Sequence, residues 1–262
     1  MSNAFKVTSQ LLRISTAVAV CALLSTEASA QVTYPSGVVE DPAPTNKYTN
    51  GRSRTIDSLI VHTVEGGSLS GTVNYFKTTT RNISVHYIID TNGDVVQMVD
   101  SWHTAWTQND YNSRAIGFEM VGYAGDRSTW YYDIGDAEYG TTYNNLRPNV
   151  DKLANIMAYF IEHPTNKNGA TYDIPFQRII GDAYDYPGDE LDMPGIGGHY
   201  QVTPWNKSDP GIYFPWDDLM KFVESYIDND TNVYYPTVIP EPTAIAMLSL
   251  GLPALLLRRK RA

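Results

Sequence analysis

The sequence predicts an α/β domain with a central mixed β-sheet flanked by helices. Two buried-strand patterns alternate with helical patterns along the middle of the chain, the order expected for a sheet covered by helices. Between them, a turn with an Asn-Gly pair joins two short apolar runs and predicts an antiparallel hairpin within the same sheet.

The first half of the domain is expected to supply most of the sheet. Pro, Thr, Asn and Ser dominate residues 31–55, which predicts an extended N-terminal arm. The apolar run over residues 58–62 predicts a buried strand, and two apolar residues at helical spacing predict a helix over residues 70–79. The hairpin then joins strands over residues 83–89 and 95–99.

The second half is expected to cover the sheet. Residues 115–121 form another apolar strand, and residues 150–162 and 216–227 carry apolar side chains on one helical face. Residues 123–145 and 181–197 are crowded with Tyr, Asp and Gly. We expect these two segments to be loops near a cleft, with solvated surface loops as the alternative.

Both ends of the chain carry targeting patterns. Residues 1–30 combine two basic residues, a short apolar run and an Ala-Ser-Ala site, which predicts a signal peptide. After a linker over residues 229–238, residues 239–262 contain Pro-Glu-Pro, an apolar stretch and a basic tail. This order resembles the PEP-CTERM sorting signal, which implies export in a Gram-negative bacterium and removal of the tail by an exosortase-like membrane enzyme. An uncleaved membrane anchor is the alternative at each end.

Composition narrows the class of partner. The chain has 19 basic and 29 acidic residues; without residues 1–30 and 237–262 these become 13 and 27, and the net charge falls from −10 to −14. This net negative charge argues against binding to nucleic acid and to anionic lipid, because both are themselves negatively charged. We therefore expect membrane contact only through the two terminal segments, before they are removed. The single cysteine, Cys21, lies in the signal peptide, so the processed chain needs no disulfide and no thiolate ligand. About 200 residues then remain, enough for one domain, expected over residues 56–228.

One loop near the end of this domain gathers residues with ligand and catalytic chemistry. Residues 198–211 contain His199, Lys207 and Asp209, with two prolines that restrict the backbone. Imidazole and carboxylate groups are common zinc ligands, and His62, at the end of the first buried strand, offers a third ligand. Such a set leaves a fourth position open, as catalytic zinc sites do. The alternative for His62 is a core histidine whose ring nitrogens form hydrogen bonds within the protein. In an extended backbone, Lys207 and Asp209 point to the same side, so the lysine can stabilise an oxyanion at the metal site. The alternative is that Lys207 is an ordinary solvent-exposed lysine.

Four other residues are candidates for a site. Strand alternation places Glu119 on the face opposite Phe118. A carboxylate in so apolar a run is paired, for instance with Arg114, or has a raised pKa that suits a general base. Trp102 and His103 offer an indole and an imidazole that suit a sugar or peptide groove. His86 is a further groove candidate, with a buried hydrogen-bonding role as its alternative.

Four segments of the chain, taken in order, resemble the type 2 N-acetylmuramoyl-L-alanine amidases, the zinc family that includes peptidoglycan recognition proteins and phage lysozyme-type amidases. The resemblance implies the amidase fold for one domain. The segments are residues 59–62, 83–93, 102–119 and 199–211.

Carried over residue by residue, the resemblance implies that His62, His199 and Asp209 hold Zn²⁺. It also implies that Glu119 acts as the base and that Lys207 supports the oxyanion, as in the branch with a glutamate base.

Two departures from the family pattern matter. Val85 stands where another branch has a tyrosine, which favours the glutamate branch. An insertion of about 17 residues precedes His199 and leaves Asp182 as an alternative ligand.

The function implied by the resemblance is hydrolysis of the amide between the lactyl group of N-acetylmuramic acid and L-alanine, with peptidoglycan or muropeptides as partners. The alternatives are a non-catalytic peptidoglycan-binding module and an amidase redirected to another extracellular amide. Export by signal peptidase and an exosortase-like enzyme would place the protein in the periplasm, at the cell surface or in the extracellular matrix.

Overall fold

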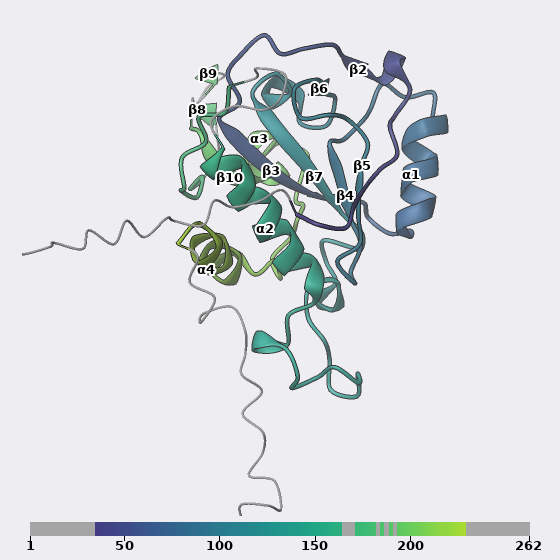
Figure 1. Cartoon of the computed structure of the whole chain (residues 1–262), viewed down its shortest axis with the longest axis vertical. Helices are drawn as coiled ribbons and strands as arrows, with labels where there is room; N and C mark the ends of the chain where they lie inside the picture. Colours follow the sequence, from purple (N-terminus) through teal and green to yellow (C-terminus); the bar gives the residue numbers. More distant parts are fainter. Residues whose placement is uncertain (1–34, 164–170, 182–183, 186–188, 191–192, 229–262) are drawn as a thin grey trace, which may run out of the picture.

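A six-stranded sheet in the order β1-β5-β4-β7-β3-β10 runs through the centre of the molecule (Figure 1). The structure is a computed structural model and describes residues 35–163, 171–181, 184–185, 189–190 and 193–228. The β4–β5 pair is antiparallel and the other four pairs are parallel, which confirms the mixed sheet. The strands are β1 (Val38–Glu40), β3 (Ser58–Thr63), β4 (Tyr87–Ile89), β5 (Val95–Gln97), β7 (Ala115–Met120) and β10 (Gly195–Gly198).

Helices cover both faces of the sheet. Those of the described residues are α1 (Leu69–Thr78), α2 (Pro148–Glu162), α3 (His199–Val202) and α4 (Trp216–Ile227), with 3-10 turns η1 (Thr45–Lys47), η2 (Asn109–Tyr111), η3 (Arg127–Thr129) and η4 (Tyr143–Asn145). None of them has the length and hydropathy needed to cross a membrane. Two small ribbons complete the fold, β2 (Tyr48–Thr49) with β6 (Thr104–Ala105) and β8 (Tyr184–Asp185) with β9 (Asp189–Glu190).

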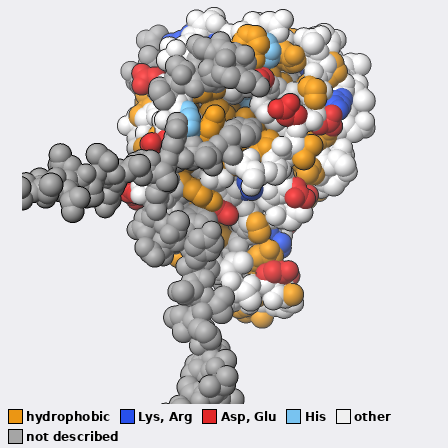
Figure 2. Space-filling model, viewed as in Figure 1, with side chains coloured by type: hydrophobic (Ala, Val, Ile, Leu, Met, Phe, Trp, Pro, Cys, Tyr) orange, Lys and Arg blue, Asp and Glu red, His pale blue; other side chains and the backbone are white. Residues whose placement is uncertain are grey.

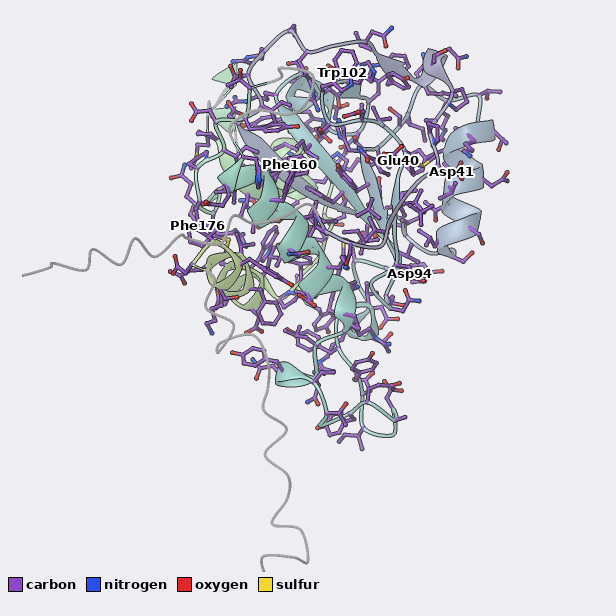
Figure 3. All side chains as sticks on the ribbon, viewed as in Figure 1. Glu40, Asp41, Asp94, Trp102, Phe160 and Phe176 are labelled. Atoms are coloured by element: carbon purple, nitrogen blue, oxygen red, sulfur yellow. The ribbon has the colours of Figure 1, made fainter. Side chains whose placement is uncertain are left out.

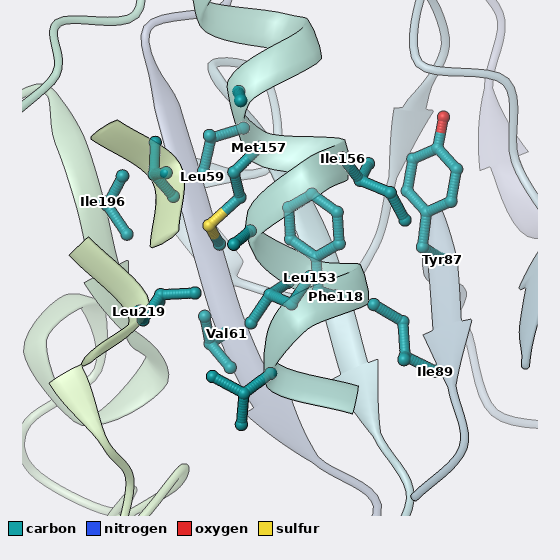
Figure 4. Packing of buried hydrophobic residues seen from close by; sticks show 14 of the residues in the cluster. Leu59, Val61, Tyr87, Ile89, Phe118, Leu153, Ile156, Met157, Ile196 and Leu219 are labelled. Carbon is teal, nitrogen blue, oxygen red and sulfur yellow. The ribbon is translucent and has the colours of Figure 1, made fainter. Parts of the chain in front are cut away.

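The largest part of the core lies between the sheet and helices α2 and α4 (Figure 4). Successive strand residues point to opposite faces, so Leu59 and Val61 of β3 point toward α2, as does Phe118 of β7. Leu153 and Met157, four residues apart on α2, pack against them from the same helix face. The predicted helices over residues 150–162 and 216–227 are confirmed, with these apolar faces buried.

The opposite face of the sheet carries the elements that position the candidate site. Val73 and Phe76 of α1 pack against Ile88 and Val96 in a second buried cluster. Ile60, which alternates with Leu59 and Val61 along β3, packs with residues near α3 in a third cluster. This face therefore receives the side chain of His62, which shares its orientation with Ile60.

Two strands of the sheet lie in segments that the sequence predicts as non-strand. β1 comes from the N-terminal arm and pairs with β5 at one edge. β10 begins within the loop predicted over residues 181–197 and pairs with β3 at the other edge. Three of its four residues are glycines, which disfavours a strand prediction. They are required by close packing, because a Cβ on Gly197 would lie 2.9 Å from Ile179 Cδ1 and one on Gly198 2.6 Å from Pro210 Cδ.

The other two differences concern loops. The strand predicted over residues 83–89 begins only at Tyr87, because the backbone N–H of Ser84 donates instead to the carbonyl of Trp106 (3.3 Å). Residues 123–145 form no strand or α-helix, as predicted, and much of the segment projects away from the sheet below α2 (Figure 1). The predicted signal peptide, linker and sorting segment, and Asp182, lie outside the described residues.

Candidate active site

His62, His199 and Asp209 converge at one edge of the sheet. Asp209 Oδ2 lies 3.2 Å from His199 Nδ1 and 3.6 Å from His62 Nδ1, and the two imidazole centroids are 4.2 Å apart. One ligand atom from each residue fits within a mutual separation of 4.8 Å, and all three residues are buried. The three ligands predicted from the sequence are thus brought together in space.

Parallel topology explains the convergence. His62 is the fifth residue of β3, and His199 follows directly on the last residue of β10, the parallel neighbour of β3. The carboxyl ends of parallel strands meet at the same edge of a sheet, which is where α/β folds place their ligands. Asp209 returns to this edge from the following loop, where Thr63 N–H donates to its Oδ2 (3.3 Å) and its own carbonyl accepts from Tyr200 N–H (3.0 Å).

A close backbone contact holds the loop that carries Asp209. Gly211 has a φ of +92°, and a Cβ at this position would lie 1.9 Å from the carbonyl oxygen of Ala124. Any side chain at residue 211 would therefore push the loop away from the 123–145 segment. The glycine at the end of the Lys-Ser-Asp-Pro-Gly motif allows this approach and keeps Asp209 against the histidines.

The donor set fits a zinc ion. The Nε2 atoms of His62 and His199 are buried and have no hydrogen-bond partner among the described residues. Burial, reinforced by the neighbouring His62, lowers the pKa of His199 to about 4, so its imidazole is neutral at physiological pH. Although burial alone would raise the pKa of Asp209, hydrogen bonds from the two histidines hold it well below its usual range. Two imidazoles and a carboxylate match the preference of zinc, whereas calcium and magnesium prefer oxygen ligands.

Glu119 lies next to this cluster, since it is the register partner of His62 in the β3–β7 pair. Its Oε2 atom is buried without a hydrogen-bond partner among the described residues. Burial raises the pKa of Glu119 to about 7, an effect that His62 opposes and the charge of Asp209 reinforces. A carboxyl group with this pKa exchanges protons readily near neutral pH.

The salt bridge offered as the alternative for Glu119 is wrong. Arg114 is buried and donates instead to Asp57, from Nε to Oδ1 at 2.8 Å and from Nη2 to Oδ2 at 2.6 Å. Arg114 comes directly before β7 and Glu119 lies near the end of that strand, so the two residues lie at opposite ends of β7.

A cleft of about 330 Å³ opens beside the cluster. Lys207 is exposed and lines this cleft together with Glu119, His199 and Asp209, and its positive charge opposes the burial that raises the pKa of Glu119. Sequence reasoning missed the residues on the remaining walls, because single aromatic or charged residues give no pattern. Those residues are Thr63, Val64, Glu65, Tyr75, Phe76, Arg81, Ile83, Trp106 and Thr107.

The predicted groove residues are not on these walls. Trp102 lies near β6 (Figure 3), where its ring centroid is 3.9 Å from that of His103, and neither residue is among those that line the cleft. His86 is fully buried, and its Nε2 lies 2.7 Å from the Arg52 guanidinium. Its Nδ1 accepts from the N–H of Gly117 (3.0 Å), so His86 has the buried hydrogen-bonding position offered as its alternative.

Acidic and basic side chains are interspersed over the face shown in Figure 2. Among the described residues on that face, lysine and arginine side chains lie singly and form no basic patch.

Comparison with known proteins identifies the family. The sequence model of the family described as N-acetylmuramoyl-L-alanine amidase (Amidase_2) matches residues 52–212. This chain belongs to that family. The matched segment contains every predicted ligand, Glu119 and Lys207.

Several known proteins are similar to this chain in sequence or in fold. The chain is 26% identical over 185 residues to N-acetylmuramoyl-L-alanine amidase A of Achromobacter lyticus, a match that covers 70% of this chain and 91% of that protein. Among solved structures, the fold is similar to that of the hydrolase AmiA of Staphylococcus aureus in complex with its ligand, with a TM-score of 0.51, 16% identity and coverage of 76% and 87%. AmpD is a further similar structure, with a TM-score of 0.45, 19% identity and coverage of 72% and 96%.

Proposed function

We propose that this chain is a zinc-dependent amidase that hydrolyses the bond between the lactyl group of N-acetylmuramic acid and the L-alanine of peptidoglycan. The observation that carries the proposal is the cluster of His62, His199 and Asp209 beside a carboxyl group with a pKa of about 7. Family membership supports the substrate, and the donor set supports the metal.

The two imidazoles and the Asp209 carboxylate would hold the zinc ion. When bound, zinc supplies Lewis-acid polarisation of a carbonyl and lowers the pKa of water. Glu119 takes the proton of the water that attacks the amide carbon and passes it to the nitrogen of the departing L-alanine. As the carbon–nitrogen bond breaks, this proton makes the leaving group a neutral amine. Lys207, on the rim of the cleft, places an ammonium group where negative charge develops on the carbonyl oxygen.

The role of Glu119 distinguishes an amidase from a module that only binds muropeptide. Mere binding requires neither a base nor an oxyanion donor. We expect Glu119→Gln to retain zinc, measured by metal analysis, and to lower turnover by about 10²- to 10⁴-fold. Unchanged turnover with bound zinc would remove Glu119 from the reaction, and zinc-dependent binding without any product in the wild-type protein would favour the binding module.

We also propose that the protein is exported, because its substrate lies outside the cytoplasmic membrane. The support is the sequence of residues 1–30 and 239–262, with their signal-peptide and PEP-CTERM-like patterns. Signal peptidase and an exosortase-like enzyme would then be its processing partners. Mass analysis of the protein recovered from its native host tests this: the proposal predicts loss of both terminal segments, and an intact chain in the cytoplasm would contradict it.

A further inference from the structure

Glu65 has a strained backbone conformation close to the metal ligands, and the chemistry described above gives it no role. It follows the last residue of β3 by two positions and lines the cleft together with Glu119 and Asp209. Its φ is +59°, in the left-handed region that residues other than glycine and asparagine rarely adopt. Such a conformation costs free energy and persists only where the surrounding contacts impose it.

Backbone hydrogen bonds on both sides of Glu65 impose the turn. The N–H of Val64 donates to the carbonyl of Met120 at the end of β7 (3.0 Å), and the N–H of Gly66 donates to the carbonyl of Gly122 (2.9 Å). A glycine at residue 65 would adopt the same conformation without strain. A glutamate in its place therefore indicates a role for the side chain.

The side chain of Glu65 joins two segments that border the metal ligands. Its Oε1 atom accepts hydrogen bonds from the hydroxyl of Thr63 (2.6 Å) and from the backbone N–H of Ala124 (3.1 Å). Thr63 directly follows His62 on β3, and Ala124 lies at the start of the 123–145 segment. One oxygen atom thus attaches the start of this segment to the end of β3.

The loop that carries Asp209 completes a closed ring of contacts. The N–H of Thr63 donates to Asp209 Oδ2 (3.3 Å), and Gly211 lies so close to Ala124 that a Cβ on it would be 1.9 Å from the Ala124 carbonyl oxygen. The ring therefore runs through Thr63, Glu65, Ala124, Gly211 and Asp209. Without the Glu65 side chain, Ala124 and the loop packed on it would lose an attachment to β3.

We propose that Glu65 is a positioning residue that holds Asp209 in place for zinc through this ring of contacts. The inference rests on the proposed function, because it concerns a ligand of the zinc site. Glu65 acts through Thr63 and Ala124 and is not itself a ligand. Hydrogen-bonding groups that orient metal ligands typically contribute about 10- to 100-fold to metal affinity, so the expected effect is large enough to measure.

Three substitutions separate the hydrogen bonds from the backbone strain. Glu65→Gly removes the acceptor and the strain together, Glu65→Ala removes the acceptor and keeps the strain, and Glu65→Gln keeps the acceptor. Competition with a chromogenic chelator gives the zinc dissociation constant of each protein. We expect Glu65→Gly and Glu65→Ala to weaken zinc binding about tenfold or more, and Glu65→Gln to stay close to wild type.

Two further variants test the path through the ring. Thr63→Val removes one of the two donors to Glu65 Oε1 and should weaken zinc binding by a smaller factor. Combined with Glu65→Gly, it should lose less than the product of the two single losses, because both changes remove the same hydrogen bond. Asn144→Gly, at a residue with a φ of +48° that does not line the cleft, is the matched control and should bind zinc as wild type does.

The outcomes separate this proposal from the proposed function. Wild-type zinc affinity in Glu65→Gly would overturn the positioning role while the zinc site stands, and so would an equal loss in Glu65→Gln. If the wild type binds no zinc, the proposed function fails, and amide hydrogen exchange of the metal-free proteins then decides. Tyr200 N–H donates to the Asp209 carbonyl (3.0 Å) and reports on the loop from outside the ring. Faster exchange of Tyr200 in Glu65→Gly alone supports the proposal, and an unchanged rate overturns it.

Discussion

The buried carboxyl group of Glu119 should make the stability of the metal-free protein depend on pH in a specific way. Its pKa is about 7 in the folded protein and about 4.5 when unfolded, because burial disfavours the charged form. The folded state therefore binds this proton more tightly than the unfolded state. Stability is lost as the pH rises from about 4.5 through 7, and the loss is complete above pH 7.

The magnitude follows from the pKa difference. At 1.36 kcal/mol per pKa unit, ionisation of Glu119 destabilises the folded protein by about 3 kcal/mol above pH 7. Glu119→Gln removes the titrating proton at nearly constant volume. We expect the free energy of unfolding of the variant to rise relative to wild type by about 2 kcal/mol between pH 5 and pH 8, or roughly 4–8 °C in Tm.

The assay is thermal or urea unfolding of both proteins in chelator across this pH range. The substitution can also change the free energy of unfolding by an amount that does not depend on pH. Only the change with pH in the difference between the two proteins therefore tests the pKa of Glu119. Added zinc should shrink the difference, because a nearby cation favours the ionised carboxylate. A difference between the two proteins that stays constant from pH 5 to pH 8 would refute the raised pKa and its cause.

Three other perturbations test separate parts of the account. Lys207→Met should lower kcat by about 10²-fold with little change in KM, whereas a solvated lysine would leave kcat unchanged. Asp209→Ala should abolish stoichiometric zinc in metal analysis and the rise in Tm that zinc gives the wild type, and retained zinc would contradict its role as a ligand. Arg114→Met removes the ion-pair partner of Asp57, which keeps only the hydrogen bond from Ser58 Oγ. The variant should lose about 3 kcal/mol in free energy of unfolding, measured in urea, without loss of zinc; a loss below about 1 kcal/mol would contradict a structural ion pair.

Strand alternation made much of the candidate site predictable. In β3 and β7, apolar residues of one parity pack under α2, so the polar residues His62 and Glu119 are left on the other face. The spacing of His199, Lys207 and Asp209 within a proline-rich loop predicted a second group of residues. The structure adds the parallel pairing of β3 with β10, which brings the two groups together.

The parts that escaped prediction depend on tertiary contacts. Glycine-rich β10 is a strand because it pairs with β3, and Gly197 and Gly198 are needed there because Ile179 and Pro210 occupy the space where side chains would lie. The place of Trp106 in the cleft depends on hydrogen bonds to Thr49 and Ser84, from segments far away in the sequence. Trp102, four residues earlier, has the same side chain but lies elsewhere, and composition alone does not distinguish the two.

The central claim is that a zinc ion held by His62, His199 and Asp209 supports cleavage of the lactyl–L-alanine amide. The most direct test is mass analysis of the products released from purified peptidoglycan by the zinc-loaded protein. The account predicts stem peptides with a free L-alanine amino terminus and glycan chains that keep intact lactyl groups, with no release after chelation. Intact peptidoglycan after treatment with fully zinc-loaded protein, or cleavage at a different bond, would contradict it.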